Sequence, residues 1–596
     1  MTRIEDYGLI GDTHTAALVS NEGSIDWLCL PRFDSPACFA ALLGTPENGH
    51  WSIQPVGPAR STVSYVGKTL VHQIVFSTPE GEVELLDFMP VPSSEHEVDV
   101  VRVVKGRSGR VDMEMEFIVR FDYGSIVPWV RRRGWGLEAI AGPNAIELRS
   151  PVELENEDFR TRARFSVAAG EVLSFELTWY PSHREPSHGV EPMAALGTTL
   201  EWWEAWAGHH TNGGEWHDLV TRSLVTLKAL TYSPTGGMVA AATTSLPEHI
   251  GSSRNWDYRY CWLRDATFTL YAMLISGYDD EARAWERWLM RAVAGKPDQM
   301  QIMFGVAGER LLFEHEIDWL PGYENSRPVR VGNGAHRQFQ LDVYGELMDS
   351  FHVARRSGIE VNEAAWHFQK QLMGALEDLW QLPDEGLWEV RGPQAHFTHS
   401  KLMAWVGFDR AVKAIERYGL PGPLARWRAL REQIHAEICE RGFDRSRNTF
   451  VQAYGSDALD AALLMMPLVG FLPGDDPRIT GTINAVRTEL SDGVFVRRYK
   501  TRESLDGLPP GEGTFLPCTF WLADALILNN RYDEGRHVFE QAIGACSPLG
   551  LLSEEFDPVS RRQLGNFPQA FSHIGLINTA QNLNRRKGPA VDRATT

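Results

Sequence analysis

The chain has 596 residues, which is longer than one hydrophobic core usually organises, so at least two domains are predicted. Its hydrophobic fraction of 43% and charged fraction of 23% are those of an ordinary globular protein and give no compositional case for long disorder. With 58 Lys and Arg against 78 Asp and Glu, the formal net charge of -20 disfavours nucleic acid and anionic membrane surfaces as partners.

The amino terminus is polar and lacks the apolar core of a signal peptide, and no run of 18 apolar residues occurs in the chain. The six cysteines are scattered, with no CxxC pair and no metal-ligand spacing. We therefore expect a cytoplasmic protein whose cysteines are free thiols, with no metal site and no cofactor.

Apolar and polar residues alternate with period two across about residues 15–190. Val111 and the apolar residues at every second position after it alternate with charged residues such as Asp112, the pattern of a half-buried strand. Similar apolar runs are separated by turn-forming stretches such as residues 78–81 (TPEG) and 106–109 (GRSG). This part of the chain is predicted to form an antiparallel β-sandwich.

Helical periodicity replaces the alternation near Leu200 and dominates after Trp262. Apolar residues such as Leu341, Tyr344 and Met348 recur three or four positions apart and give each helix one apolar stripe. About a dozen such segments fit before the tail, and many end at a glycine, which best adopts the left-handed cap. The pattern alone predicts a β domain followed by many helices that pack on each other in pairs.

Two stretches carry acidic residues set among aromatics and glycines, as glycoside cleavage requires. That reaction needs one carboxylic acid to protonate the leaving oxygen and one carboxylate to activate water or attack carbon. In residues 384–391 (DEGLWEVR), Glu389 follows Trp388, which we expect to shield it and raise its pKa. Residues 550–558 (GLLSEEFDP) hold a second acidic cluster that includes Glu554.

A third stretch, residues 258–266 (YRYCWLRDA), places Arg264 and Asp265 at the start of an apolar helix. On spacing alone, the acidic residues of the first two stretches could equally be solvated surface acids, and Arg264 and Asp265 could be an ion pair at the start of a helix. Both features are common in proteins without any catalytic role. The chain carries no P-loop, dinucleotide GxGxxG, GxSxG elbow or HExxH motif, so nucleotide, serine-hydrolase and metalloprotease chemistry lack support.

Taken together, the three stretches resemble glycoside hydrolase family 15, the glucoamylase and bacterial trehalase family of inverting α-glucosidases. The family's Trp-x-Arg-Asp motif, which binds sugar at the cleavage subsite, matches Trp262, Arg264 and Asp265. Its Leu-Trp-Glu motif matches residues 387–389, so the resemblance implies that Glu389 is the general acid. Its Ser-Glu-x-aromatic-Asp motif matches residues 553–557, so the resemblance implies that Glu554, rather than the adjacent glutamate, is the general base.

Looser matches to the family extend the set of expected sugar contacts to Trp388, Arg498 and Tyr499. Residues 328–342 are similar to a segment that lines the family's subsites but depart from the fungal pattern. Three residues there have side chains suited to sugar hydroxyls, although a capped loop before a helix describes the same segment equally well; they are Arg330, Gln338 and Asp342.

The amino-terminal residues 7–15 and 23–28 are similar to the start of the trehalase-type members, so the resemblance covers nearly the whole chain. It implies a multidomain α and β fold, in which an antiparallel β-sandwich is followed by an (α/α)6 barrel. The predicted boundaries are a sandwich at 1–195, a helical linker at 196–240, a catalytic barrel at 241–585 and a polar tail at 586–596.

The resemblance implies an exo-acting inverting α-glucosidase, with α,α-trehalose as the favoured substrate and maltose, isomaltose or longer α-glucans as alternatives. A disaccharide phosphorylase would use phosphate in place of water and need no base, and a non-catalytic sugar-binding protein would need neither acid. The presence of both Glu389 and Glu554 argues against these two alternatives. The expected partner is a small sugar, and the sequence does not determine the oligomeric state.

Overall fold

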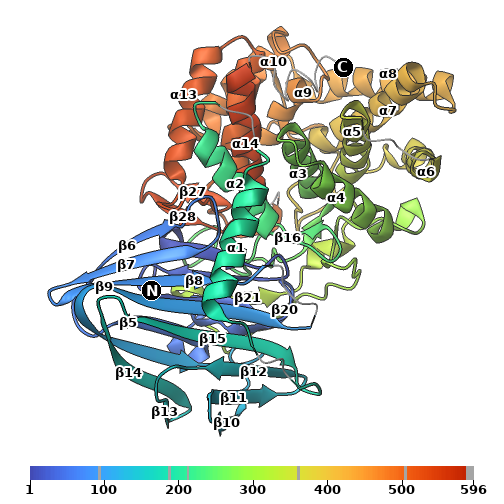
Figure 1. Ribbon diagram of the computed structural model, residues 1–596. Coiled ribbons are helices and arrows are strands. Elements are labelled where there is room, and N and C mark those ends of the chain that lie inside the picture. Colours follow the sequence, from blue (N-terminus) through green and yellow to red (C-terminus); the bar gives the residue numbers. More distant parts are fainter. Residues whose placement is uncertain (92–95, 186–188, 211–213, 359–362, 502–505, 586–596) are drawn as a thin grey trace.

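The computed structural model describes the chain except for residues 92–95, 186–188, 211–213, 359–362, 502–505 and 586–596. The predicted polar tail at 586–596 therefore lies outside the described residues. Two bodies are visible in Figure 1: the strands of the amino-terminal part form one, and the helices of the carboxyl-terminal part form the other. Among the described residues, no helix combines the length and apolarity needed to cross a membrane.

The amino-terminal body is a two-layered antiparallel sheet joined through one long strand, β9 (Val98–Ile118). The carboxyl-terminal half of β9 pairs with β5 (His50–Pro55) and β14 (Arg160–Ala168), and its amino-terminal half pairs with β8 (Gly81–Phe88) and β15 (Val172–Pro181). Further strands extend both layers: β1 (Tyr7–Gly11), β2 (Ala16–Ser20), β3 (Ser24–Cys29), β4 (Ala37–Phe39), β6 (Arg60–Tyr65), β7 (His72–Thr78), β10 (Trp129–Arg133), β11 (Gly136–Ala141), β12 (Asn144–Arg149) and β13 (Glu155–Glu157).

Alternation explains why these residues form a sandwich. In the second half of β9, Val111, Met113 and Met115 are buried and Asp112 is exposed, because successive side chains of a strand point to opposite faces. The buried faces of both layers form one hydrophobic core. The sequence expectation of a half-buried strand at this place is confirmed.

The carboxyl-terminal body is a ring of inner helices, each packed on its neighbours, with a second layer outside. Within the described residues, the inner ring closes in the order α3 (Leu263–Ile275), α5 (Asp342–Arg356), α7 (Thr398–Tyr418), η7 with α9 (Ala461–Leu464, Met465–Leu468), α12 (Leu516–Leu528), α14 (Ala570–Arg585) and back to α3. The outer helices are α4 (Asp279–Ala292), α6 (Glu363–Leu379), α8 (Leu424–Arg441), α10 (Pro477–Glu489), α13 (Tyr532–Ala542) and α2 (His217–Ala229).

The predicted fold class, an antiparallel β-sandwich followed by an (α/α)6 barrel, is confirmed. The connection between the two bodies contains α1 (Pro192–Ala207) and α2, and the predicted boundary after residue 195 lies inside α1. Helix α2, which falls within the predicted linker, packs on α14 and so completes the outer layer of the ring.

The sandwich also supports the loop that leads into α3. Arg259 is buried and donates through Nη2 to the hydroxyl of Tyr123 (2.7 Å) and through Nη1 to the carbonyl of Ser35 (2.8 Å), both in the sandwich. Its Nε donates to Asp257 Oδ1 (2.9 Å) in its own loop. Trp27 of β3 donates through Nε1 to the carbonyl of Ala242 (2.9 Å). The amino-terminal domain therefore fixes the segment that precedes the predicted sugar-binding motif.

Candidate active site

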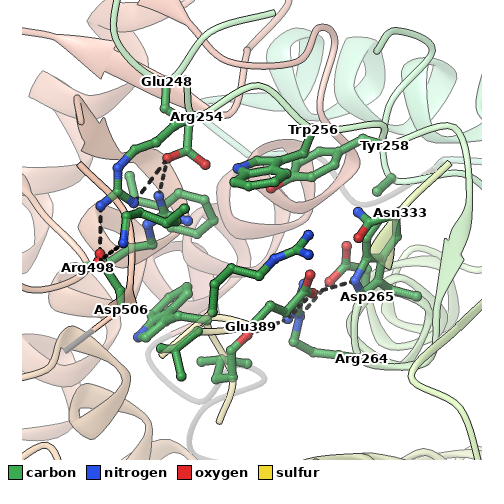
Figure 2. Close-up of a pocket in the computed structure, with 18 of the residues that line it drawn as sticks. Glu248, Arg254, Trp256, Tyr258, Arg264, Asp265, Asn333, Glu389, Arg498 and Asp506 are labelled. Atoms are coloured by element: carbon green, nitrogen blue, oxygen red, sulfur yellow. Dashed lines mark hydrogen bonds and ion pairs between the residues drawn. The ribbon is translucent and has the colours of Figure 1, made fainter. Parts of the chain in front are cut away.

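A cavity of about 690 Å³, including its opening to solvent, lies where the loops before the inner helices converge. Figure 2 shows that its lining comes from segments far apart in the chain, with acidic, basic and aromatic side chains facing one another. The lining includes Glu248, Arg254, Trp256, Tyr258, Trp262, Arg264, Asp265, Asn333, Trp388, Glu389, Arg391, Arg498, Tyr499, Asp506, Phe515 and Gln569.

The first turn of α3 contributes the predicted Arg-Asp pair. Arg264 Nε donates to Asp265 Oδ1 (2.7 Å), and Arg264 Nη1 donates to the carbonyl of Leu387 (2.9 Å). A carboxylate at this position is favoured because the amino-terminal end of a helix carries partial positive charge. Arg264 thus links α3 to the loop that carries Glu389. The stretches 258–266 and 384–391 are therefore adjacent in space.

Glu389 is held at the cavity by three contacts. Trp262 Nε1 donates to Glu389 Oε1 (2.6 Å), and Arg264 Nη1 lies 3.8 Å from the same oxygen. Its backbone adopts a left-handed conformation with φ of 57°, which is strained for a residue other than glycine. Gln338 Nε2 donates to the carbonyls of Glu389 (3.2 Å) and Val390 (3.0 Å) and so stabilises this conformation.

Burial raises the pKa of Glu389, while Arg264 and the hydrogen bond from Trp262 oppose the rise. The direction agrees with a general acid. The indole that hydrogen-bonds the carboxyl of Glu389 is that of Trp262, not that of the adjacent Trp388. Trp388 Nε1 donates instead to Asp460 (2.9 Å). Trp388 itself lines the cavity.

Glu554 is nearly completely buried, at 1% exposed, directly before β27 (Glu555–Asp557). Tyr258 OH donates to Glu554 Oε1 (2.6 Å), and the backbone N–H of Asn566 donates to Oε2 (3.4 Å). Burial, reinforced by the negative charge of Glu248, raises the pKa of Glu554 to about 8. The cavity wall in front of Glu554 is Tyr258, not the glutamate itself.

One pair of aromatic rings joins the two glutamates. Tyr258, which binds Glu554, and Trp262, which binds Glu389, lie edge to face with ring centroids 5.3 Å apart. Both rings line the cavity. The structure therefore places Glu389 in the wall of the cavity and Glu554, which is far from it in the chain, directly behind Tyr258 of the same wall.

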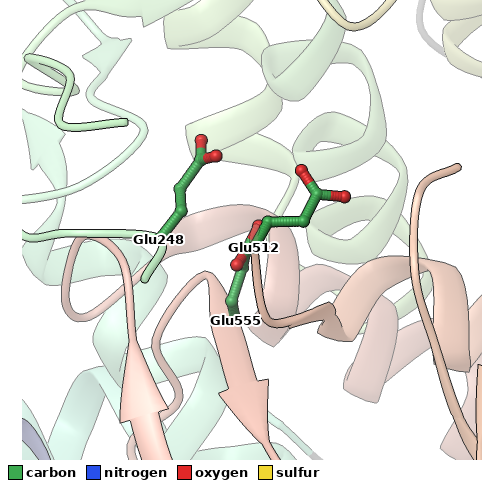
Figure 3. A group of neighbouring side chains, drawn as sticks. All are labelled: Glu248, Glu512 and Glu555. Atoms are coloured by element: carbon green, nitrogen blue, oxygen red, sulfur yellow. The ribbon is translucent and has the colours of Figure 1, made fainter. Parts of the chain in front are cut away.

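A second charged cluster lies beside this wall. The carboxylates of Glu248, Glu512 and Glu555 converge, with oxygens from all three within 4.8 Å of one another (Figure 3). Three carboxylates are a donor set that suits a divalent cation. Here the guanidinium of Arg498 lies among them, with Nη2 at 2.7 Å from Glu248, 2.7 Å from Glu512 and 3.2 Å from Glu555. Arg498 therefore neutralises part of this acidic cluster.

The structure separates the predicted sugar-binding residues into two groups. Trp262, Arg264, Asp265, Trp388, Arg498 and Tyr499 line the cavity. Arg330, Gln338 and Asp342 do not.

Each of these last three residues has a different environment. Arg330 Nη1 donates to the carbonyls of Ser253 (2.7 Å) and Asn255 (3.0 Å) and so holds the loop that carries Trp256. Gln338 supports the backbone of Glu389, as described above. Asp342 is buried in the first turn of α5, where burial raises its pKa to about 6 and Arg264 opposes the rise.

Sequence reasoning did not single out several lining residues, among them Glu248, Arg254, Trp256, Tyr258 and Arg391. Trp256 and Tyr258 stand only a few positions before the Trp262 motif, and Arg391 stands two positions after Glu389. Proximity to a motif was therefore the available signal for these three. Nothing in the local sequence marks Glu248 or Arg254.

Comparisons with known proteins agree with this geometry. A family model described as glycosyl hydrolases family 15 matches residues 214–581, and a model described as trehalase-like, N-terminal, matches residues 1–178. A trehalase of Mycolicibacterium smegmatis is 38% identical, over 98% of this chain and 92% of the relative. A trehalase of Thermoplasma volcanium is 36% identical, over 98% of this chain and 93% of the relative.

Among solved structures, a bacterial glucoamylase complexed with acarbose superimposes with a TM-score of 0.69. The match covers 99% of this chain and 95% of the glucoamylase at 13% sequence identity. At that identity the likeness shows a shared fold and leaves the chemistry to the site itself.

Proposed function

The chain belongs to glycosyl hydrolases family 15, and on this premise we propose that it hydrolyses α,α-trehalose to two glucose molecules with inversion at the attacked carbon. That the chain is a glycoside hydrolase follows from the family model and from relatives matched over nearly their full length. The choice of trehalose rests on those relatives, which are trehalases. The partner is a small sugar, and a cytoplasmic location stays a prediction.

One observation carries the proposed mechanism: the half-buried Glu389 and the buried Glu554, from different motifs, each accept a 2.6 Å hydrogen bond from one member of a single aromatic pair. A glycosidase requires two carboxyls that act on opposite sides of one bond. Trp262 holds the carboxyl of Glu389 at the cavity, and Tyr258, which lines the same cavity, holds the carboxyl of Glu554 directly behind the wall. Surface acids, the alternative interpretation of the sequence, would share neither a cavity nor such a pair of donors.

In the proposed reaction, Arg264 and Asp265 bind hydroxyls of the glucose that is attacked. Glu389 donates its proton to the bridging oxygen, and the bond between that oxygen and the anomeric carbon breaks. Glu554 takes a proton from water, whose oxygen forms the new bond to the same carbon from the opposite face. The two carboxyls then exchange protons with solvent and return to their starting states.

The remaining lining residues are assigned to sugar binding. Trp388 and Phe515 present aromatic surface, which suits the apolar faces of a pyranose ring. Arg498 and Tyr499 line the cavity while bound to carboxylates, Arg498 to the acidic cluster and Tyr499 OH to Asp506 (3.0 Å). We assign to these two the task of shaping the wall opposite Arg264.

Proton NMR of the first products tests the proposal. Inverting hydrolysis of α,α-trehalose releases one β-glucose from the attacked ring and one α-glucose from the leaving ring, so the two anomers form in equal initial amounts. A retaining enzyme releases α-glucose alone. Maltose and isomaltose, assayed in parallel in phosphate-free buffer, should be poorer substrates. Initial formation of α-glucose alone contradicts the mechanism, and faster cleavage of maltose contradicts the substrate.

A further inference from the structure

The rim of the cavity carries an ion pair that takes no part in the proposed reaction. This ion pair joins two loops. Arg391 Nη2 donates to Glu314 Oε2 (3.0 Å), which joins the loop after Glu389 to the loop that precedes β20 (His315–Ile317). The side chains of Arg391 and Glu314 are 29% and 24% exposed, whereas those of Arg254 and Arg498 deeper in the cavity are 2% and 8% exposed. The ion pair therefore lies at the mouth.

Several contacts place Arg391 over the cavity rather than in solvent. Its guanidinium carbon lies 4.8 Å from the centroid of the Trp256 ring, which lines the cavity, and Arg330 lies 4.5 Å from the same centroid without lining it. The guanidinium of Arg330 therefore packs on Trp256 from outside the cavity, and the guanidinium of Arg391 packs on it at the mouth. Glu314 is fixed in turn, because Oε2 also accepts from the backbone N–H of Gly334 (2.8 Å).

A third loop closes on the same point. The backbone N–H of Arg391 donates to the carbonyl of Asp506 (2.8 Å), and the Asp506 carboxylate accepts from Arg254 Nη2 (2.6 Å). Gly507 has φ of 73°, and a Cβ there would approach the backbone of Arg391 to 2.9 Å, so only glycine allows this packing. The rim around Arg391 is therefore built from residues of three loops and is anchored to the cavity wall.

We propose that the Arg391–Glu314 ion pair closes the leaving-group end of the cavity and limits the substrate to two sugar rings. This inference rests on the proposed function and deepens it by assigning a cause of chain-length specificity. A contact of 3.0 Å leaves no passage between these two side chains, so a third ring that continued in their direction would meet them. A disaccharide lies wholly inside the rim and allows the pair to close behind it.

The energetics of the pair suit this role. Partly exposed ion pairs contribute little to stability, because water solvates the separated charges well. The pair therefore opens at small cost to admit a disaccharide. A longer α-glucan would have to keep it open and would leave Arg391 without its carboxylate beside Trp256, and such an unpaired group lowers affinity.

Two variants remove the pair in different ways. Arg391→Met deletes the charge while keeping an unbranched side chain over Trp256. Glu314→Gln keeps an oxygen for the Gly334 N–H but removes the charge that holds Arg391. Arg337→Met is the matched control, because Arg337 is exposed on η6 (Gly334–Arg337) and does not line the cavity. Melting temperatures establish that each variant is folded.

The measurement is competitive inhibition by maltose, maltotriose and maltotetraose of whichever disaccharide the enzyme hydrolyses. In the wild type and in Arg337→Met, the inhibition constant should rise with chain length. In Arg391→Met and Glu314→Gln, the ratio of the maltotetraose constant to the maltose constant should fall at least about tenfold.

An unchanged ratio in both folded variants overturns the inference, as does a wild type that binds maltotetraose as tightly as maltose. So does a lack of inhibition by any of these oligosaccharides in the variants. The ratio of inhibition constants can be measured with any disaccharide that the enzyme cleaves. A finding that trehalose is not the substrate would therefore contradict the proposed function without deciding this inference.

Discussion

Replacement of Glu554 by glutamine tests the assigned base directly, because its neighbour Glu555 provides a matched control. The amide in Glu554→Gln keeps an oxygen that can accept the 2.6 Å hydrogen bond from Tyr258, so the local structure should persist. The amide cannot accept a proton from water. General-base terms of about a hundredfold to ten-thousandfold correspond to about 2.7 to 5.4 kcal/mol of activation free energy. We expect kcat to fall by more than about a hundredfold.

Glu555 is equally buried but has different contacts. Its Oε2 accepts from the backbone N–H of Gly513 (2.7 Å), and its Oε1 lies 3.2 Å from Arg498, in the acidic cluster. Burial, with the charge of Glu248 adding to it, raises the pKa of Glu555 well above its ordinary value, so glutamine is close to its neutral form in shape and charge. We expect Glu555→Gln to lower kcat by less than about tenfold.

The assay measures glucose released from trehalose under saturating substrate, with melting temperatures to confirm that both variants fold. Azide adds a chemical readout. In Glu554→Ala, azide attacks the anomeric carbon from the side that water would use. The bond to the bridging oxygen breaks, and the second glucose leaves with the proton of Glu389 on that oxygen. The product is β-glucosyl azide. Near-normal turnover of Glu554→Gln, or an equal loss in Glu555→Gln, would refute the assignment of the base.

Three further outcomes follow from the same contacts. Tyr258→Phe removes the donor to the Glu554 carboxylate, a contact of about 1.5 to 3 kcal/mol, so kcat should fall about tenfold to a hundredfold with little change in KM; an unchanged kcat contradicts this positioning role. The active pair carries a single proton, held by Glu389, while Glu554 is ionised. Since the pKa of Glu554 is about 8, the pair keeps this last proton up to about pH 8, and kcat/KM should fall at higher pH, where neither carboxyl is protonated. Glu248→Gln removes a charge that raises this pKa and should move that alkaline limb to lower pH, whereas an unmoved limb excludes Glu248 as the cause. Arg259→Met leaves buried Asp257 without its cation and should destabilise the protein by about 3 to 5 kcal/mol in urea unfolding, and a loss below about 1 kcal/mol would show that the sandwich contact is dispensable.

Local sequence was sufficient for the elements and for the motifs. The alternation after Val111 predicts a strand, and the period of Leu341, Tyr344 and Met348 predicts a buried helical stripe, because both patterns follow from backbone geometry over a few residues. The Trp-x-Arg-Asp motif at 262–265 and the acid at Glu389 are equally local, and both line the cavity. The closing of the helices into a ring came from resemblance to a family, since periodicity specifies each helix and not its neighbours.

The looser predictions show the limit of that reasoning. Arg330, Gln338 and Asp342 have the side chains that a sugar would require, yet they hold the loop of Trp256, support the backbone of Glu389 and lie buried at the start of α5, respectively. Residue type alone does not distinguish a group that contacts substrate from one that positions such a group, because both use the same hydrogen-bonding chemistry.

The sequence by itself determined which carboxyls were candidates, and only the tertiary structure decided how they are held. Tyr258 and Trp262 form one aromatic pair that binds Glu554 and Glu389, although these glutamates lie far apart along the chain. The rim contact between Glu314 and Arg391 likewise joins loops from different helical hairpins. Such contacts depend on where the ring of helices places its loops, and no local pattern of residues specifies that placement.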